Sequence, residues 1–243
     1  MVGPFVYLAL IAVGFPAGRS APTADGEIVY FADVFPRGTI AEAPMFIDER
    51  LVEEHAGVLV STHVTRDRAG ATVIRESATH SGDYALIEYT LYANQFGQAG
   101  TIRVQGDQVS YERLEGTERQ TRAEHVNGPV VVGPTLVGYI VRHLDLLQAG
   151  EELEVRLAVL DRLETYGFKL KAVEAGPGQT RIRMKPSSFL IAMAVDPLYF
   201  TFETATRKPI RLEGRVSPEV RDEDGWHSVD ARVEYRLLLG AYR

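Results

Sequence analysis

The sequence has no cysteine among its 243 residues. This absence excludes disulfide bridges, thiolate metal sites, a cysteine nucleophile and a lipid anchor attached to cysteine. Stability must therefore come from a hydrophobic core. The length of the chain and its 45% hydrophobic content are sufficient for one large core.

An excess of positive charge is also missing. The chain has 26 Lys and Arg residues against 33 Asp and Glu residues, which gives a formal net charge of -7. Such a protein repels phosphate backbones, so we predict no nucleic-acid partner. Arg66, Arg68 and Arg75 flank one expected hairpin, and we interpret them as a solvated face.

Familiar catalytic motifs are absent as well. There is no nucleophile elbow, no phosphate-binding P-loop, no dinucleotide fingerprint, no zinc-protease motif and no EF-hand loop. The histidines do not have the spacing of a metal-binding pair, and abundant carboxylates do not by themselves define a catalytic pair. The six histidines are His55, His63, His80, His125, His143 and His227. We predict no catalytic residue, no metal site and no cofactor.

One long charge-free run stands near the start of the chain, at residues 5–15. It is too short for a membrane-spanning helix, which needs roughly 20 apolar residues, and has the length of a signal-peptide core. Gly18 and Ser20 supply the small residues of a cleavage site before Ala21. We therefore predict a signal peptide at residues 1–20 and a periplasmic or secreted mature protein without a membrane span. A misassigned start of the sequence and an uncleaved anchor are the alternatives.

From residue 26 onward, alternation of side chains with a period of two dominates. Residues 58–66, 71–79 and 85–93 are rich in β-branched and aromatic side chains and are separated by short polar turns. Each expected strand is followed at once by a tight turn, which favours antiparallel neighbours. The pattern predicts about eleven or twelve strands in a single domain over residues 21–243.

One segment departs from this alternation. Leu136, Ile140, Leu144 and Leu147 recur at helical spacing between Gly133–Pro134 and Gly150. A proline at the start and a glycine at the end are typical helix signals, so we predict a helix over about residues 135–149. The expected fold class is mainly β: an antiparallel, strongly curved sheet or partly open barrel with this one main helix.

A second apolar run, residues 187–195, carries no charge and fits neither a strand nor a helix period. It is either a buried core segment or the lining of an apolar pocket. On the second interpretation, seven residues from this region and from the expected helix are candidates for ligand binding. They are Phe189, Ile191, Met193, Tyr199, Phe200, Leu136 and Ile140.

The export signal, the long meander, the helix after the first strands and the strand-turn-strand segment at residues 204–212 together resemble the periplasmic β-clam proteins. That group includes lipoprotein carriers of the LolA and LolB type. The resemblance implies an incomplete barrel around a helix, with a hydrophobic cavity that receives acyl chains. Because the chain has no cysteine for lipid attachment, only a soluble LolA-like form agrees with it. No functional residue is carried over.

Three functions remain open. The first is a soluble binding or carrier protein that holds a lipid or another hydrophobic small molecule in the concavity of the sheet. The second is a structural or interaction protein of the cell envelope, which uses an exposed sheet edge and has a filled interior. The third is an enzyme whose scattered carboxylates and histidines converge in a cleft.

Overall fold

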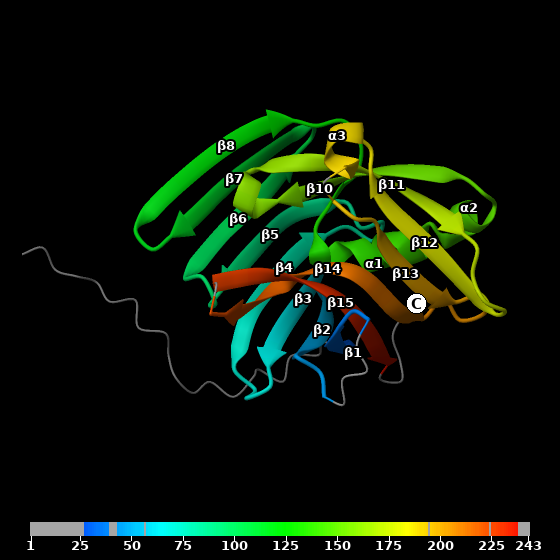
Figure 1. Cartoon of the computed structure of the whole chain (residues 1–243). Helices are drawn as coiled ribbons and strands as arrows, with labels where there is room; N and C mark the ends of the chain where they lie inside the picture. The colour runs from blue at the N-terminus through cyan, green and yellow to red at the C-terminus, as the bar shows by residue number, and fades with distance from the viewer. Residues whose placement is uncertain (1–26, 39–42, 56, 194, 224, 238–243) are drawn as a thin grey trace, which may run out of the picture.

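The computed structural model describes residues 27–38, 43–55, 57–193, 195–223 and 225–237 (Figure 1). The expected signal peptide at residues 1–20 lies outside these residues. Among the described residues, no helix is both long and apolar enough to cross a membrane.

All described strands belong to one curved sheet of 15 strands. The first eight are β1 Glu27–Pro36, β2 Phe46–His55, β3 Val58–Asp67, β4 Thr72–His80, β5 Leu86–Ala93, β6 Gln98–Gln105, β7 Gln108–Glu115 and β8 Glu118–His125. The others are β9 Val130–Val131, β10 Glu152–Val159, β11 Glu164–Val173, β12 Gln179–Pro186, β13 Leu198–Glu203, β14 Pro209–Asp222 and β15 Gly225–Leu237.

The sheet consists of two meanders joined through the first and last strands. Strands β8 back to β1 lie side by side in chain order, β1 pairs with β15, and β15 back to β9 complete the sheet. Every pairing is antiparallel except that of the short β9 with β10. Tight turns make this possible: Gly106, for example, has a φ of 63° in the turn between β6 and β7, a conformation that glycine adopts without strain.

The expected helix lies inside the curve of the sheet (Figure 1). It is present as two consecutive helices, α1 Gly133–Arg142 and α2 Leu144–Gln148. The break falls at His143, whose backbone leaves the helical region with φ -106° and ψ 15°. Gly150 ends α2 with a φ of 94°, while the amide of Glu151 reaches back to the carbonyl of Leu146, as in a Schellman cap.

A close contact fixes α1 to the first meander. The ring of Tyr84 lies directly on Gly138, where an added Cβ would stand only 2.0 Å from the ring. The same ring stacks on His80 with the ring centroids 4.7 Å apart. Only a residue without a side chain allows the helix to approach this closely, so Gly138 sets the distance between helix and sheet.

The main core lies between the helices and the second meander. Its fully buried members on the strands are large apolar side chains, and the helices contribute an apolar stripe that packs on them. The strand residues include Leu170, Ile182, Met184 and Phe202, and the helix residues include Ile140, Leu144 and Leu147. Burial of these side chains holds the helix in the concavity.

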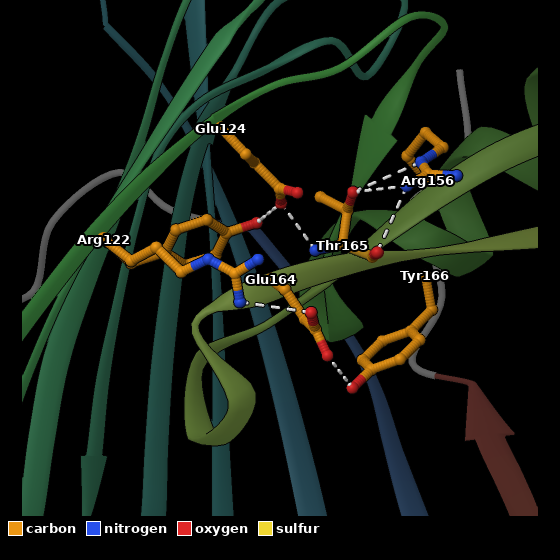
Figure 2. A network of polar contacts seen from close by, with 7 residues as sticks. Arg122, Glu124, Arg156, Glu164, Thr165 and Tyr166 are labelled. Atoms are coloured by element: carbon orange, nitrogen blue, oxygen red, sulfur yellow. Dashed lines mark hydrogen bonds and ion pairs between the residues drawn. The ribbon is translucent and has the colours of Figure 1, made fainter.

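Side chains bridge the two ends of the curved sheet, as Figure 2 shows. Glu124 of β8 accepts hydrogen bonds from the hydroxyl of Tyr111, at 2.7 Å, and from the backbone amide of Thr165 of β11, at 2.6 Å. Arg122 of β8 forms an ion pair with Glu164 at 3.1 Å. Arg156 of β10 also donates to Thr165. The sheet is therefore an open barrel whose gap is spanned by polar side chains.

The predicted fold class is confirmed: the structure is mainly β, with a strongly curved antiparallel sheet and one main helical segment. The predicted strand number was too small, because four of the 15 strands were not expected. They are β1, β2, β8 and β9. Strand β2 has charged residues at inward positions, β8 has alanine as its only apolar residue, and β9 has only two residues, so none of these three has a strong apolar alternation.

Candidate functional site: a central cavity

A cavity of about 330 Å³ lies between α1 and the concave face of the sheet. One part of its wall is apolar and comes from several elements. Leu136 and Val137 belong to α1, Leu160 to the short 3-10 helix Leu160–Arg162, Phe200 to β13 and Leu212 to β14. The size lies within the range of about 300–1,000 Å³ typical of small-molecule sites.

The opposite part of the wall is polar and comes from the neighbouring strands β2, β3 and β4. Antiparallel pairing places Asp48 of β2 opposite Thr65 of β3, and His63 of β3 opposite Glu76 of β4. Because side chains alternate across a strand, the four residues lie on the same inward face. We call Asp48, His63, Thr65 and Glu76 the polar wall.

Each carboxyl group of the polar wall receives one hydrogen bond from a neighbour. The hydroxyl of Thr65 donates to Asp48 at 2.7 Å, and the hydroxyl of Tyr89 donates to Glu76 at 2.7 Å. Burial raises the pKa of Asp48 to about 6, against the lowering effect of the Thr65 hydrogen bond. Burial likewise raises the pKa of Glu76 to about 7, and the nearby charge of Asp48 adds to that rise.

The histidine of the wall is neutral. Burial lowers the pKa of His63, the positive charge of Arg50 adds to this effect, and the resulting pKa is about 3. The Nε2 atom of His63 lies 3.1 Å from the hydroxyl of Tyr30. A neutral imidazole beside two carboxyl groups leaves the wall with acidic character.

Beside the polar wall, on the same inward face of β2, β3 and β4, runs a fully buried hydrogen-bond chain. Arg50 donates to the hydroxyl of Ser61 at 3.1 Å, and that hydroxyl lies 2.8 Å from Nε2 of His80. Nδ1 of His80 lies 2.8 Å from the carbonyl oxygen of Ser81, so this nitrogen carries the proton and Nε2 accepts from Ser61. All three side chains, Arg50, Ser61 and His80, have no exposed surface. A substrate cannot reach this serine–histidine pair, which therefore supports the wall.

The chemistry of the cavity is that of acid–base and hydrogen-bond recognition. Among the described residues, no group of three or more histidine and acidic side chains could hold a metal ion. Carboxyl groups with pKa values of about 6 and 7 exchange protons near neutral pH. Such groups can accept hydrogen bonds from a ligand or exchange protons with it.

The structure brings together only part of the predicted ligand-binding set. Leu136 and Phe200 line the cavity. Ile140 is fully buried in the main core, and Tyr199 stacks against Arg181, with the guanidinium carbon 4.4 Å from the centre of the ring. Neither belongs to the cavity wall.

Among the described residues of the uncharged run, 187–193 and 195, none lines the cavity. It forms the short helix α3, Phe189–Ala192, at the margin of the sheet (Figure 1). Phe189 is 77% exposed and Met193 is 73% exposed, while Ile191 is half-buried. A turn of four residues is too short to bury an apolar stripe, so these side chains remain at the surface.

Sequence reasoning missed the polar wall. His63 stood out only as a histidine on an expected strand, and Asp48 and Glu76 resembled the many solvated carboxylates of an acidic protein. The available signal was the hairpin at residues 58–79: the turn after Asp67 sets its register and places His63 opposite Glu76.

Comparisons with known proteins do not supply a function. No family model matches the chain, and neither a curated protein nor a solved structure matches it. The cavity and its polar wall are therefore the basis for assigning a function.

Proposed function

We propose that the protein binds a small hydrophobic or amphipathic molecule in the central cavity and acts as a periplasmic or secreted binding or carrier protein. The observation that supports this most directly is the cavity itself: about 330 Å³, with apolar side chains on one wall and a few convergent polar groups on the other. This combination is typical of ligand sites, in which apolar contacts provide affinity and polar groups provide orientation. Residues 5–15 of the sequence support export.

Co-purification and dye binding test the proposal. Organic extraction of the purified protein followed by mass spectrometry should reveal a bound amphipathic molecule. An environment-sensitive apolar dye should bind saturably, with one site per chain. If no molecule co-purifies and the dye finds no saturable site, the binding proposal is wrong.

A matched pair of variants links the dye site to the cavity. Ala158 of β10 lines the cavity and is buried, whereas Ala123 of β8 is exposed. Ala158→Phe fills the cavity and should abolish dye binding, while Ala123→Phe should leave it unchanged. Thermal unfolding of both variants checks that loss of binding does not reflect loss of the fold, because overpacking costs about 1–3 kcal/mol.

The cavity weighs against an envelope protein with a filled interior. The edge strand β8 also opposes strand addition from a partner, because its Arg122 and Glu124 already bridge to β11. Charged side chains at a sheet edge discourage pairing with another chain.

The convergence of Asp48, His63 and Glu76 on one cavity favours a second candidate function, proton-transfer catalysis on the bound molecule. A carboxyl group with a pKa near 7 is matched to general acid–base work at neutral pH. Molecules extracted from the unmodified protein and from Glu76→Gln separate the two functions. A binding protein yields the same compound from both, whereas an enzyme accumulates its unconverted substrate in the variant.

A further inference from the structure

The two carboxyl groups of the polar wall have unused acceptor capacity. Thr65 occupies Oδ1 of Asp48, and Tyr89 occupies Oε1 of Glu76. Within the described part of the chain, Oδ2 of Asp48 and Oε2 of Glu76 receive no hydrogen bond, and neither carboxyl group takes part in an ion pair. Both residues line the cavity, so a ligand there meets two free acceptor oxygens.

The charges around the cavity have a negative balance. The charged residues of its lining are Asp48, Glu76, Asp161 and Arg215, and the neutral His63 adds no positive charge. Arg50 lies beside the wall on the same inward face, opposite His63 but outside the cavity lining, and its guanidinium donates to Ser61. An anionic head group at this wall would face two carboxyl groups that offer no donor once ionised.

We infer that the ligand of this cavity is an amphipathic cation, with an ammonium group between Asp48 and Glu76 and an alkyl or similar apolar body against Leu136, Leu160 and Phe200. This inference rests on the proposed binding function and names its ligand class. An ammonium group has three donors and no acceptor, which is the complement of two carboxylate oxygens in an otherwise apolar chamber.

The same geometry sets the pH dependence of binding. The groups that face the two carboxyl groups are His63, Thr65, Tyr89 and the N-terminal end of α1 at Gly133, where an added Cβ would be 3.3 Å from Glu76. The other titratable or charged groups near the cavity are Arg50, Asp161, Arg215, Tyr30 and Tyr235. Burial raises the pKa of Asp48 to about 6 and that of Glu76 to about 7, so both carboxyl groups hold protons in mildly acidic solution. A bound cation requires their ionised forms, and its affinity must therefore increase with pH through this range.

Three ligands with the same apolar chain test the inference: decylamine, decanol and decanoate, each measured by displacement of the bound apolar dye and by calorimetry. Decylamine should bind at least about tenfold more tightly than decanol at neutral pH. A charge-assisted hydrogen bond contributes more free energy than a neutral one, and the difference corresponds to about a factor of ten in affinity. Decanoate should bind more weakly than decanol. The affinity for decylamine should increase between about pH 5 and about pH 8, while that for decanol should change little.

Isosteric variants assign the preference to the polar wall. Glu76→Gln and Asp48→Asn should each lower decylamine affinity about tenfold and leave decanol affinity nearly unchanged. Glu88→Gln is the matched control, because Glu88 lies on the outward face of β5 in an ion pair with Arg103 and touches no part of the cavity. Saturable decanol binding and a cooperative thermal unfolding transition, at or above the wild-type melting temperature, report that each variant is folded.

The outcomes separate this inference from the proposed function. Equal affinities for the three ligands, or decylamine affinity that survives both Glu76→Gln and Asp48→Asn, would overturn the cationic ligand class and leave the binding function intact. If none of the three ligands displaces the dye, and the dye itself has no saturable site, the binding function also fails.

Discussion

The two meanders that face each other across α1 differ in what their inward faces carry. Strands β10 to β13 present large apolar side chains, such as Leu170, Met184 and Phe202, which are fully buried against the helices. Strands β2 to β4 present the polar wall and, beside it, the buried chain of Arg50, Ser61 and His80. The polar wall is confined to β2 to β4, because β5 to β7 of the same meander bury apolar side chains such as Leu86, Ile102 and Val109.

This difference separates stability from recognition within one fold. Apolar burial on the second meander provides the free energy that holds the helices in place. Polar groups on the first meander reduce stability when they are ionised or lose a partner, because burial penalises charge and unpaired hydrogen-bonding groups. Substitutions on the two faces should therefore have different signatures.

The largest effect is expected on the apolar face. Phe202→Ala removes a fully buried aromatic ring from the main core and should lower the free energy of unfolding by about 3–5 kcal/mol. Urea denaturation followed by circular dichroism measures this change. A loss below about 1 kcal/mol would mean that the second meander does not carry the main core.

A smaller effect, with a pH signature, is expected at the polar wall. Between pH 4.5 and about 7 the folded protein retains the Glu76 proton that the unfolded chain releases, so wild-type stability falls through this window relative to a variant without the carboxyl group. Glu76→Gln should therefore gain roughly 1–3 kcal/mol over the wild type as pH rises through this range. Measurements of the free energy of unfolding at several pH values determine the difference.

The carboxyl group of Asp48 provides a check on the pH range expected for Glu76, because its pKa is raised for the same reason but to a lower value. Asp48→Asn should gain stability in the same direction but over a lower range, from pH 3.8 to about 6. His63 acts in the opposite sense, because its pKa is lowered to about 3 and protonation below 6.5 favours the unfolded chain. Only differences between variant and wild type therefore isolate each carboxyl group. Parallel curves for wild type and Glu76→Gln would contradict the burial of this group.

Breaking the buried chain beside the wall should lower the free energy of unfolding by an intermediate amount. Ser61→Ala removes the hydroxyl that links Arg50 to His80 and leaves both nitrogens without that partner, which should cost about 1–3 kcal/mol. Ser77→Ala on β4 is the control, since within the described residues the Ser77 hydroxyl makes a single long contact, of 3.4 Å, with Thr62. Chemical denaturation of both variants should separate them; equal effects would show that the chain does not support the wall.

The smallest effect is expected at α3. Phe189→Ser and Met193→Ser alter two side chains that are 77% and 73% exposed and lie outside the cavity. Stability should change by less than about 0.5 kcal/mol, and dye binding should not change. Loss of dye binding in either variant would restore the interpretation of residues 187–195 as part of the ligand site.

The same contrast explains what could be predicted from the sequence. Alternating apolar residues in segments such as 85–93, and the spacing of Leu136, Ile140 and Leu144, identify strands and a helix that bury an apolar side. The polar wall escapes this logic, because Asp48 and Glu76 face inward where alternation predicts apolar residues. Their position follows from the register of three strands, which local pattern alone does not supply.

The uncharged run at residues 187–195 is the opposite case, because apolar side chains such as Phe189 and Met193 face the solvent. Its composition suggested burial, yet α3 turns Phe189 and Met193 outward because the chain makes a single short turn between β12 and β13. Composition reports how apolar a segment is, whereas exposure depends on whether another element lies close enough to cover it. In this protein the curved sheet packs over α1 and buries its apolar side chains, whereas Phe189 and Met193 at α3 remain exposed.

The polar bridge between β8 and β11 has a consequence for how the molecule behaves among other proteins. A foreign strand that tried to extend the sheet beyond β8 would have to displace Glu124 from the Thr165 amide and strip Arg122 of its partner Glu164. Both bridges would be lost before a new strand could pair with this part of β8, and their loss opposes strand addition there.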